Sequence, residues 1–461
     1  MKHAHVAAGA LLLSGFVLGK GAARALDLGA PPDGVQATTT VGLTPAPTEG
    51  TGTREEEADP EEDGDAEETP AAPGPEKTVI HHVDEDALES SALAPTAPPR
   101  KRGNWQVGVE LKRALDSLQP KGQFIVANRG GERVQTTLRA DLQEAAENIL
   151  KDYQVPAGGV IMMDPRTGAI LAAAGHSEDG SLGRELAVVP MAPAASIFKI
   201  VTGAALLEKG VSSEEETCFV GGRRRVKSRD LTNAAPSKGN CVTFSQALAK
   251  SANIPFARMT QEHLKTTDLE KWAGLFQFNR PLPLGVPLSP AFIPQPGGLD
   301  FAATGAGFGD VRMSALHGAL IASAIANDGI MPTPALWKDG VTGAGRKVMD
   351  GNHARVIGAM MEMTVTEGTA RKAFRERRRY ALGNVRAAGK TGSLAEQGPF
   401  RDYSWFVGYA PAENPTVVVS TFIMNDAQWR IRASYVGREM LANALLKGHK
   451  TYRPAKDVAR R

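Results

Sequence analysis

The stretch APAASIFKIVTGAALLEKG, residues 192–210, is apolar on nearly every side and still contains a lysine near its start. A helix with apolar residues all round is typical of a protein core, so the stretch predicts a buried helix. Pro193, a favoured first-turn residue, marks its expected beginning. Lys199 falls inside this helix, three residues after Ser196. Because lysine is almost never fully buried without a partner or a task, this lysine requires an explanation.

Ser196 and Lys199 form an S-x-x-K pair whose placement on a helix suits nucleophilic catalysis. Residues three apart share one helical face, so the amine can reach the hydroxyl. In the first turn, free backbone N–H groups and the positive end of the helix dipole stabilise developing negative charge. Burial lowers the pKa of a lysine, which makes its neutral amine an available base. The pair alone is a common pattern and does not identify an enzyme.

The bulk properties of the chain bound its class. It has 461 residues, of which 23% are charged, and its formal net charge is +2. This composition is ordinary for a soluble globular protein, and the length allows two or three domains. A charge so near zero gives no support for nucleic-acid binding. His81 and His82 have no companions at metal-ligand spacing, so we expect neither a metal nor a cofactor.

The N-terminal quarter of the chain differs from the rest. Residues 1–25 combine a basic start, an apolar run and a small-residue cleavage pattern, which predicts a signal peptide. The run is short for a membrane span, but a short membrane anchor remains an alternative. Residues 26–99 are rich in proline, alanine and acidic side chains, which predicts a disordered linker. We therefore expect an exported protein, periplasmic or attached to the outer face of the cytoplasmic membrane, with a basic tail at residues 449–461.

Cys218 and Cys241 are the only cysteines of the chain. In an exported protein they are free to pair. A disulfide closing this loop is worth about 3 kcal/mol in the chain-entropy model. Two free, buried thiols are the alternative.

A globular domain is expected at residues 133–448, after a short lead-in at residues 100–132. Residues 158–175 form two β-rich runs around a D-P-R-T-G turn, and further strand patterns occupy residues 384–425. The pattern between these two regions is mostly helical. Strands early and late with helices between them predict an α+β domain. One central antiparallel sheet would be built from both ends of the chain, flanked by helices, with a helical subdomain inserted in the middle.

Two further short motifs accompany the pair formed by Ser196 and Lys199. Ser251-Ala252-Asn253 gives S-x-N, and Lys390-Thr391-Gly392 gives K-T-G. The order S-x-x-K, S-x-N, K-T-G is the signature set of the penicillin-recognising serine acyl transferases. The sequence therefore resembles a penicillin-binding protein transpeptidase domain, and the resemblance extends over about residues 133–447.

The resemblance implies a role for each reacting group. Ser196 attacks a carbonyl carbon and becomes an ester, and Lys199 accepts the hydroxyl proton. Ser251 relays that proton toward the leaving amine. Asn253 hydrogen-bonds a substrate amide and holds Lys199 in place. Lys390 supplies positive charge that recognises a substrate carboxylate and keeps Lys199 neutral.

The remaining positions of the third motif are implied to bind substrate. Thr391 binds the same carboxylate as Lys390. Gly392 lets a substrate backbone approach the strand edge, as in β-strand addition. The backbone N–H groups of Ser196 and Ser393 form the oxyanion hole.

The implied activity is that of a D,D-transpeptidase, which cross-links peptidoglycan stem peptides ending in D-Ala-D-Ala and is acylated by β-lactams. Other cell-wall synthesis proteins are candidate partners. A D,D-carboxypeptidase or a β-lactamase-type hydrolase of the same superfamily is an alternative. The long interval between Asn253 and Lys390 disfavours a β-lactamase. A penicillin-binding sensor or scaffold without turnover is the alternative outside the enzymes.

Overall fold

The computed structural model describes residues 105–220, 226–232, 239–376, 379–397, 400–427 and 429–449. The expected leader at residues 1–25 and linker at residues 26–99 lie outside the described residues. So does the predicted C-terminal tail, apart from His449. Of the helices in the described ranges, none has both the length and the apolar character that a membrane crossing needs.

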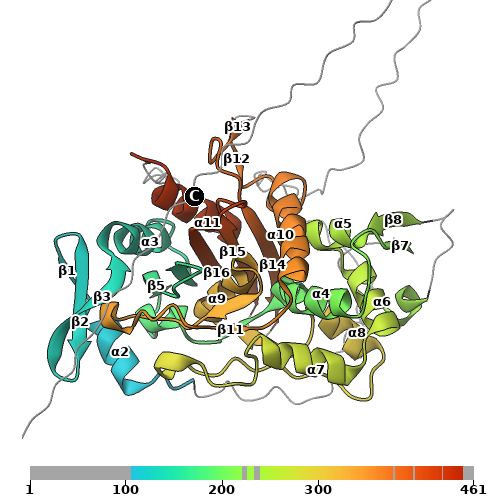
Figure 1. The fold of residues 1–461 in the computed structure, drawn as a ribbon, viewed down its shortest axis with the longest axis horizontal. Helices are drawn as coiled ribbons and strands as arrows, with labels where there is room; N and C mark the ends of the chain where they lie inside the picture. Colours follow the sequence, from blue (N-terminus) through green and yellow to red (C-terminus); the bar gives the residue numbers. More distant parts are fainter. Residues whose placement is uncertain are drawn as a thin grey trace, which may run out of the picture. The chain divides into compact units, whose positions relative to one another are not determined.

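A five-stranded antiparallel sheet lies at the centre of the domain (Figure 1). In spatial order its strands are β14 (Ala388–Glu396), β15 (Arg401–Ala410), β16 (Val417–Asn425), β4 (Ala157–Met163) and β5 (Ile170–Ser177). The first three strands come from the end of the domain and the other two from its beginning. The expected α+β architecture, with one sheet built from both ends of the chain, is confirmed. Strand β14 stands at an edge of this sheet.

Helices cover both faces of the sheet. Helix α9 (Ala315–Ala326) packs on one face, and α3 (Ala140–Asp152) and α11 (Ala433–Leu445) pack on the other. Side chains alternate between the faces of a strand, so in β4 Ile161 belongs to the core under α9 while Val160 belongs to the core under α3 and α11. All seven residues of β4 are buried. The sheet is thus a dry and rigid support for its edge strand.

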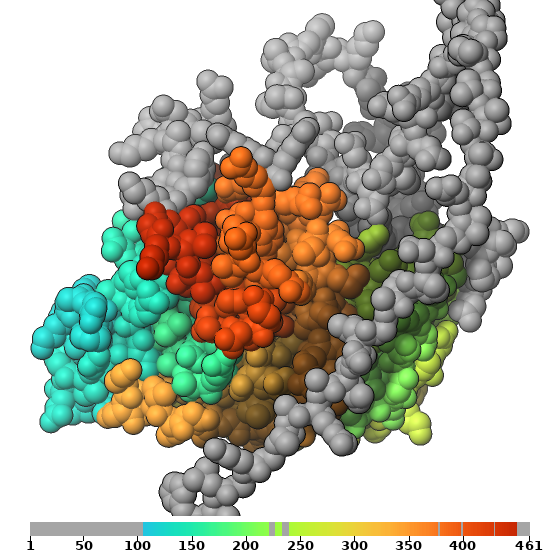
Figure 2. All heavy atoms as spheres, turned by 45° about the horizontal axis from the view of Figure 1, so that its top comes forward, coloured from blue at the N-terminus to red at the C-terminus, as the bar shows by residue number. Residues whose placement is uncertain are grey.

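A largely helical region lies between the two halves of the sheet in the sequence. Its helices are η2 (Ala195–Ile197), α4 (Phe198–Glu208), η3 (Ser228–Leu231), α5 (Phe244–Ala249), α6 (Asn253–His263), α7 (Thr266–Leu275), η5 (Pro283–Gly285), α8 (Leu299–Gly305), η6 (Lys338–Gly340) and α10 (Gly351–Thr366). Its short strands are β6 (Ala192–Pro193), β7 (Glu216–Phe219), β8 (Asn240–Thr243), β9 (Arg312–Met313), β10 (Ile330–Pro332), β11 (Gly345–Lys347), β12 (Arg375–Glu376) and β13 (Arg379–Tyr380). In Figure 2 the red C-terminal residues lie between the cyan early residues and the green part of this region. The first ten residues of α4 are buried, which confirms the predicted core helix.

Pro193 does not begin that helix, so this detail of the prediction was wrong. It lies in β6, paired with Arg312 of β9, and its carbonyl oxygen accepts a hydrogen bond of 2.8 Å from Trp405 Nε1. The helical turn starts at η2 and continues as α4 from Phe198. These tertiary partners hold residues 192–193 extended, and they override the first-turn preference of proline.

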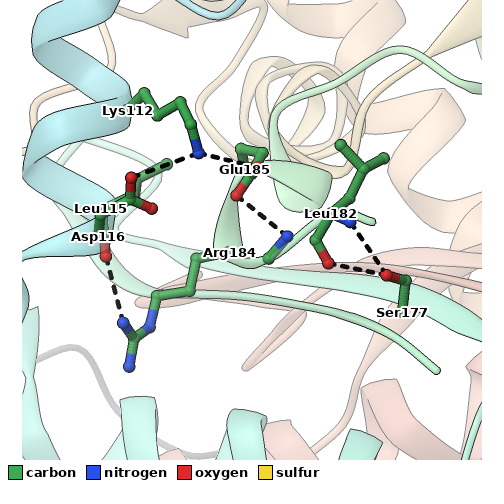
Figure 3. A network of polar contacts seen from close by, with 8 residues as sticks. Lys112, Leu115, Asp116, Ser177, Leu182, Arg184 and Glu185 are labelled. Carbon is green, nitrogen blue, oxygen red and sulfur yellow. Dashed lines mark hydrogen bonds and ion pairs between the residues drawn. The ribbon is translucent and has the colours of Figure 1, made fainter. Parts of the chain in front are cut away.

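The lead-in is folded and belongs to the same core. It contains α2 (Val109–Asp116), β1 (Gln119–Lys121) and β2 (Phe124–Arg129), and the two strands pair in the order β1-β2-β3 with β3 (Glu132–Arg139). Polar contacts join α2 to η1 (Arg184–Ala187), as Figure 3 shows. Lys112 Nζ lies 3.0 Å from Glu185 Oε1, and the Arg184 guanidinium donates to the Leu115 carbonyl at 3.2 Å. Because η1 packs on β5, α2 is fixed to the central sheet through it.

A disulfide joins Cys218 of β7 to Cys241 of β8, which face each other in this antiparallel pair. Arg258 of α6 donates to the carbonyl oxygens of Cys218 and Asp230. The guanidinium is buried and uses these main-chain acceptors in place of water. The cross-linked hairpin is therefore held against α6, the helix that begins with Asn253.

Candidate active site

The three sequence motifs meet between the edge strand β14 and the helices beside it (Figure 1). Ser196 lies in η2, and Lys199 lies in the first turn of α4. Ser251 occupies the turn between α5 and α6, and Asn253 is the first residue of α6. Lys390 lies in β14. The chain thus brings five separately placed side chains to one location.

Lys199 is completely buried and has three polar neighbours. Its Nζ donates to Asn253 Oδ1 at 2.7 Å and to the Ala306 carbonyl oxygen at 2.6 Å, and it lies 2.8 Å from Ser196 Oγ. The first two partners are acceptors only, so they take two N–H hydrogens. In the neutral amine, the lone pair that remains is free to face the Ser196 hydroxyl. Burial, with a further contribution from the charge of Lys390, holds the pKa of Lys199 well below its ordinary value.

Lys390 is equally buried and links the second motif to the third. Its Nζ donates to Ser251 Oγ and to the Thr391 carbonyl oxygen, at 2.8 and 2.9 Å. Burial lowers the pKa of Lys390 to about 7. At neutral pH this amine is therefore close to its midpoint, and an incoming anion would favour its charged form.

The backbone is in a sparsely populated conformation at Ser251 and directly before Ser196. Ser251 has φ of 53°, and Ala195, directly before Ser196, has φ of 48°. Such left-handed positions cost a non-glycine residue about 1–3 kcal/mol and cluster at functional sites. Gly307 packs against the strained turn, because a Cβ there would lie 2.4 Å from the Ala195 carbonyl oxygen. The fold therefore holds Ser196 in place from two sides, through Gly307 and through β14.

The other third-motif residues follow along β14. Thr391 is half-buried, and its hydroxyl lies 2.5 Å from that of Thr369. Gly392 abuts the nucleophile: a Cβ there would lie 3.3 Å from the Ser196 backbone nitrogen. Ser393 is exposed, next along the strand. The edge of β14 therefore runs past Ser196.

Two further residues contact the motif residues, although no sequence motif indicates them. The Ala306 carbonyl oxygen is the third partner of Lys199, and as a backbone atom it has no signal in residue type. Thr369, just after α10, touches Thr391 although no motif contains it. Within the described ranges, no three metal-binding side chains gather into a group that could hold an ion.

The site can perform acyl transfer through a serine ester. It presents a hydroxyl, an adjacent buried amine, a second hydroxyl linked to a second amine, and a strand edge that pairs with no further strand of the described ranges. A nucleophile with a base in hydrogen-bond reach, and a third group that orients the base, is the general signature of covalent catalysis. Asn253, which accepts a hydrogen bond from Lys199, stands in the position of such a third group.

The chain is similar to known proteins in sequence. The peptidoglycan D,D-transpeptidase PbpA of Mycolicibacterium smegmatis is 27% identical over 368 residues, which cover 69% of this chain and 74% of that protein. The penicillin-binding protein PbpB of Mycobacterium tuberculosis is 27% identical over 363 residues, covering 69% of this chain and 52% of that protein. This chain thus matches about half the length of PbpB.

Solved structures share the fold. The D,D-transpeptidase domain of a peptidoglycan glycosyltransferase from Eggerthella lenta superposes with a TM-score of 0.55 at 25% identity, covering 68% of this chain and 82% of that chain. Penicillin-binding protein A from M. tuberculosis, as an imipenem acyl-enzyme, gives 0.54 at 24% identity, covering 68% and 79%. The family model described as the penicillin binding protein transpeptidase domain matches residues 158–447. With the three motifs gathered around Ser196, the chain belongs to the penicillin-binding protein transpeptidase family.

Proposed function

We propose that the chain is a peptidoglycan D,D-transpeptidase that works through an acyl-enzyme on Ser196. One observation carries the proposal: the buried Lys199 Nζ lies 2.8 Å from Ser196 Oγ while two acceptors, Asn253 Oδ1 and the Ala306 carbonyl oxygen, take two of its N–H groups, so that in the neutral amine the lone pair is left to the Ser196 hydroxyl. An amine in that state is a base aimed at a nucleophile. The relatives named peptidoglycan D,D-transpeptidase support the choice of reaction.

The first half-reaction follows from this geometry. Ser196 Oγ attacks the carbonyl carbon of the D-Ala-D-Ala bond while Lys199 takes the hydroxyl proton. The developing oxyanion is stabilised by the backbone N–H groups of Ser196 and Ser393. The C–N bond then breaks, and the leaving D-alanine amine receives a proton through Ser251. The products are an ester on Ser196 and free D-alanine.

The second half-reaction restores the enzyme. An amine of a neighbouring stem peptide attacks the ester carbonyl, and its extra proton passes to the Ser196 oxygen as the C–O bond breaks. A new amide joins the two stems. If water attacks in place of the amine, the product is a trimmed stem peptide, which is carboxypeptidase activity.

Substrate recognition falls to the edge of β14. An extended peptide adds to an open strand edge by main-chain hydrogen bonds, and Gly392 keeps that edge close to Ser196. The terminal carboxylate of the stem peptide is bound by Thr391, with the charge of Lys390 behind it. The transpeptidase domain is proposed to span residues 133–448, with residues 100–132 as its lead-in.

The proposed reaction takes place on the cell wall, so the protein has to leave the cytoplasm. We assign residues 1–25 to the export signal or short anchor, and residues 26–99 to a linker that sets the reach of the domain. Other wall-synthesis proteins are candidate partners of this protein.

Acylation by a β-lactam tests the nucleophile. A fluorescent penicillin is expected to label the full chain at Ser196, and Ser196→Ala is expected to abolish the label. Peptide mapping after digestion identifies the modified residue. Label at another residue, or label retained in Ser196→Ala, would refute the assignment.

Product analysis tests the reaction. The purified protein, a stem-peptide donor and an added amine acceptor are expected to give cross-linked dimers by mass spectrometry. Trimmed monomers alone would show a D,D-carboxypeptidase. A stable acyl-enzyme without any product would show a sensor or scaffold.

A further inference from the structure

The proposed oxyanion hole takes its two N–H groups from separate segments of the chain. Ser196 lies in η2, whereas Ser393 lies in β14. Such a hole works only when both donors point at one oxygen atom, and losing one donor costs about 10²- to 10³-fold in rate. The spacing between η2 and β14 therefore has to be held closely. Residues that hold it influence the reaction without touching the substrate.

Arg312 joins these two segments with one side chain. Its backbone lies in β9, which pairs with β6 just ahead of Ser196. Its guanidinium donates to the Met191 carbonyl oxygen and to Glu396 Oε1. Glu396 is the last residue of β14. Arg312 thus bonds both to the segment that leads into Ser196 and to the strand that carries Ser393.

The acceptor on β14 is itself fixed in place. The Tyr403 hydroxyl donates to Glu396 Oε2 at 3.1 Å, and Tyr403 is buried in the neighbouring strand β15. Because a guanidinium is planar and rigid, two of its N–H groups on different acceptors fix the position of both acceptors. The Asp310 carboxylate, 4.0 Å from Arg312 Nε, lies beyond hydrogen-bond distance and adds only favourable charge.

Stability of the fold is a weak reason for this bridge between Arg312 and Glu396. Their side chains keep 29% and 30% of their surface exposed, respectively. Ion pairs that water reaches contribute little to the free energy of unfolding. A geometric role is different, because a displacement of about 1 Å at a reacting centre can cost about 10²-fold in rate.

We propose that Arg312 is a positioning residue that sets the spacing between the Ser196 and Ser393 N–H groups. It ties the segment ahead of Ser196 to the end of β14, so that the two donors converge on the oxygen of the attacked carbonyl. The inference rests on the proposed function, because the oxyanion hole belongs to that mechanism. Since the hole acts on charge that develops in the transition state, Arg312 affects the rate of acylation more than the initial binding of substrate.

Acylation by benzylpenicillin separates binding from chemistry. Quenched-flow mass spectrometry over a range of drug concentrations gives the limiting rate constant of acylation and the half-saturating concentration. Arg312→Met is expected to lower the limiting constant about 10- to 100-fold and to change the half-saturating concentration less than about 3-fold. Glu396→Ala removes the other half of the bridge and is expected to have the same effect. Glu396→Gln keeps an acceptor oxygen for Arg312 and is expected to stay within about 3-fold of the unmodified chain.

A double variant tests whether the two residues act as one unit. Arg312→Met combined with Glu396→Ala is expected to match either single variant to within about 3-fold, because the bridge can be broken only once. Losses that multiply would show independent effects and would overturn the bridge.

The acyl-enzyme gives a second readout. Infrared difference spectroscopy with an isotope label at the β-lactam carbonyl reports the stretch of the ester carbonyl, which rises in wavenumber when hydrogen bonds to its oxygen weaken. Arg312→Met is expected to shift this band to higher wavenumber. A band at the position of the unmodified chain would contradict a role in the oxyanion hole.

Arg184→Met is the matched control. Arg184 also bonds to one carboxylate, that of Glu147, and to one main-chain carbonyl oxygen, that of Leu115 (Figure 3), and its side chain is 32% exposed. The variant is expected to lose as much stability in urea unfolding as Arg312→Met, but to keep the acylation constant within about 2-fold. An equal loss of rate in both variants, or an unchanged rate in Arg312→Met, would overturn the proposal. Absence of any adduct on the unmodified chain would instead overturn the proposed function itself, so the two failures are distinguishable.

Discussion

Replacing Lys390 by methionine should change how the stability of the protein depends on pH. The folded chain releases the Lys390 proton near pH 7, whereas the unfolded chain holds it until its ordinary pKa of 10.5. Between these values the unfolded state binds more protons, so the free energy of unfolding rises as pH rises. At neutral pH the burial of this amine therefore lowers the free energy of unfolding, and its deprotonation in alkaline solution removes this destabilisation.

The magnitude follows from the gap between the two pKa values. One pKa unit corresponds to about 1.4 kcal/mol. Allowing for partial protonation at each end, the free energy of unfolding gained from Lys390 between pH 7 and pH 10 is about 3.5 kcal/mol. The variant lacks this contribution. The hydrogen bonds that the variant loses to Ser251 and Thr391 do not titrate in this range, so they cancel when the two pH values are compared.

Urea unfolding at the two pH values measures the effect. The pH-dependent gain of the unmodified chain should exceed that of Lys390→Met by about 3.5 kcal/mol. Lys338→Met, at an exposed lysine, is the matched control and should follow the unmodified chain. If Lys390→Met and the unmodified chain show the same pH dependence to within about 1 kcal/mol, burial does not depress the pKa of Lys390 and the reasoning is refuted.

Three further predictions concern other parts of the domain. Burial lowers the pKa of His317 to about 4, so as pH falls from 6.5 the unfolded state binds the proton before the folded state does. Relative to His317→Gln, the unmodified chain should lose about 3 kcal/mol of unfolding free energy by pH 4, as measured by urea unfolding. The same pH dependence in both proteins would contradict this prediction. Replacing Cys218 and Cys241 by serine should lower the free energy of unfolding by about 3 kcal/mol, since the disulfide spans 23 residues; unchanged denaturant midpoints would exclude this contribution. Gly307→Ala should slow penicillin acylation at least about 10-fold and lower the melting temperature, because Gly307 has a φ of 92° and a Cβ there would collide with the Ala195 carbonyl oxygen. A normal acylation rate would show that the turn tolerates the methyl group.

The sheet and the motif residues that meet beside it could be identified from the sequence because their signals are local. Each strand of the sheet is a short run of β-forming residues bounded by turn residues, and such runs keep their pattern wherever they pair. The three motifs are also recognised by residue type, because their candidate side chains carry a hydroxyl, an amide or an amine. The buried helix was predictable for the same reason, because its apolar character does not depend on its neighbours in space.

The remaining features depend on contacts between distant segments. Pro193 is extended because Arg312 and Trp405 hold it there, and neither lies nearby in the sequence. Ala306 acts through its carbonyl oxygen, which every residue possesses. Thr369 meets Thr391 only because the end of α10 docks on α5. Sequence patterns report periodicity and residue type, and these three positions are defined by neither.

The open edge of β14 also has a consequence for solubility. An unpaired strand edge accepts a chosen peptide and equally accepts the edge of another copy, which is a route to aggregation. Residues that point into solvent along β14 are small or polar, namely Ser393 and Ala395. Short side chains of this kind leave the edge accessible without promoting aggregation, because they offer little apolar surface to a second strand. Variants that place valine or isoleucine at these two positions would raise the propensity to aggregate, so the same edge that admits substrate also restricts which residues can line it.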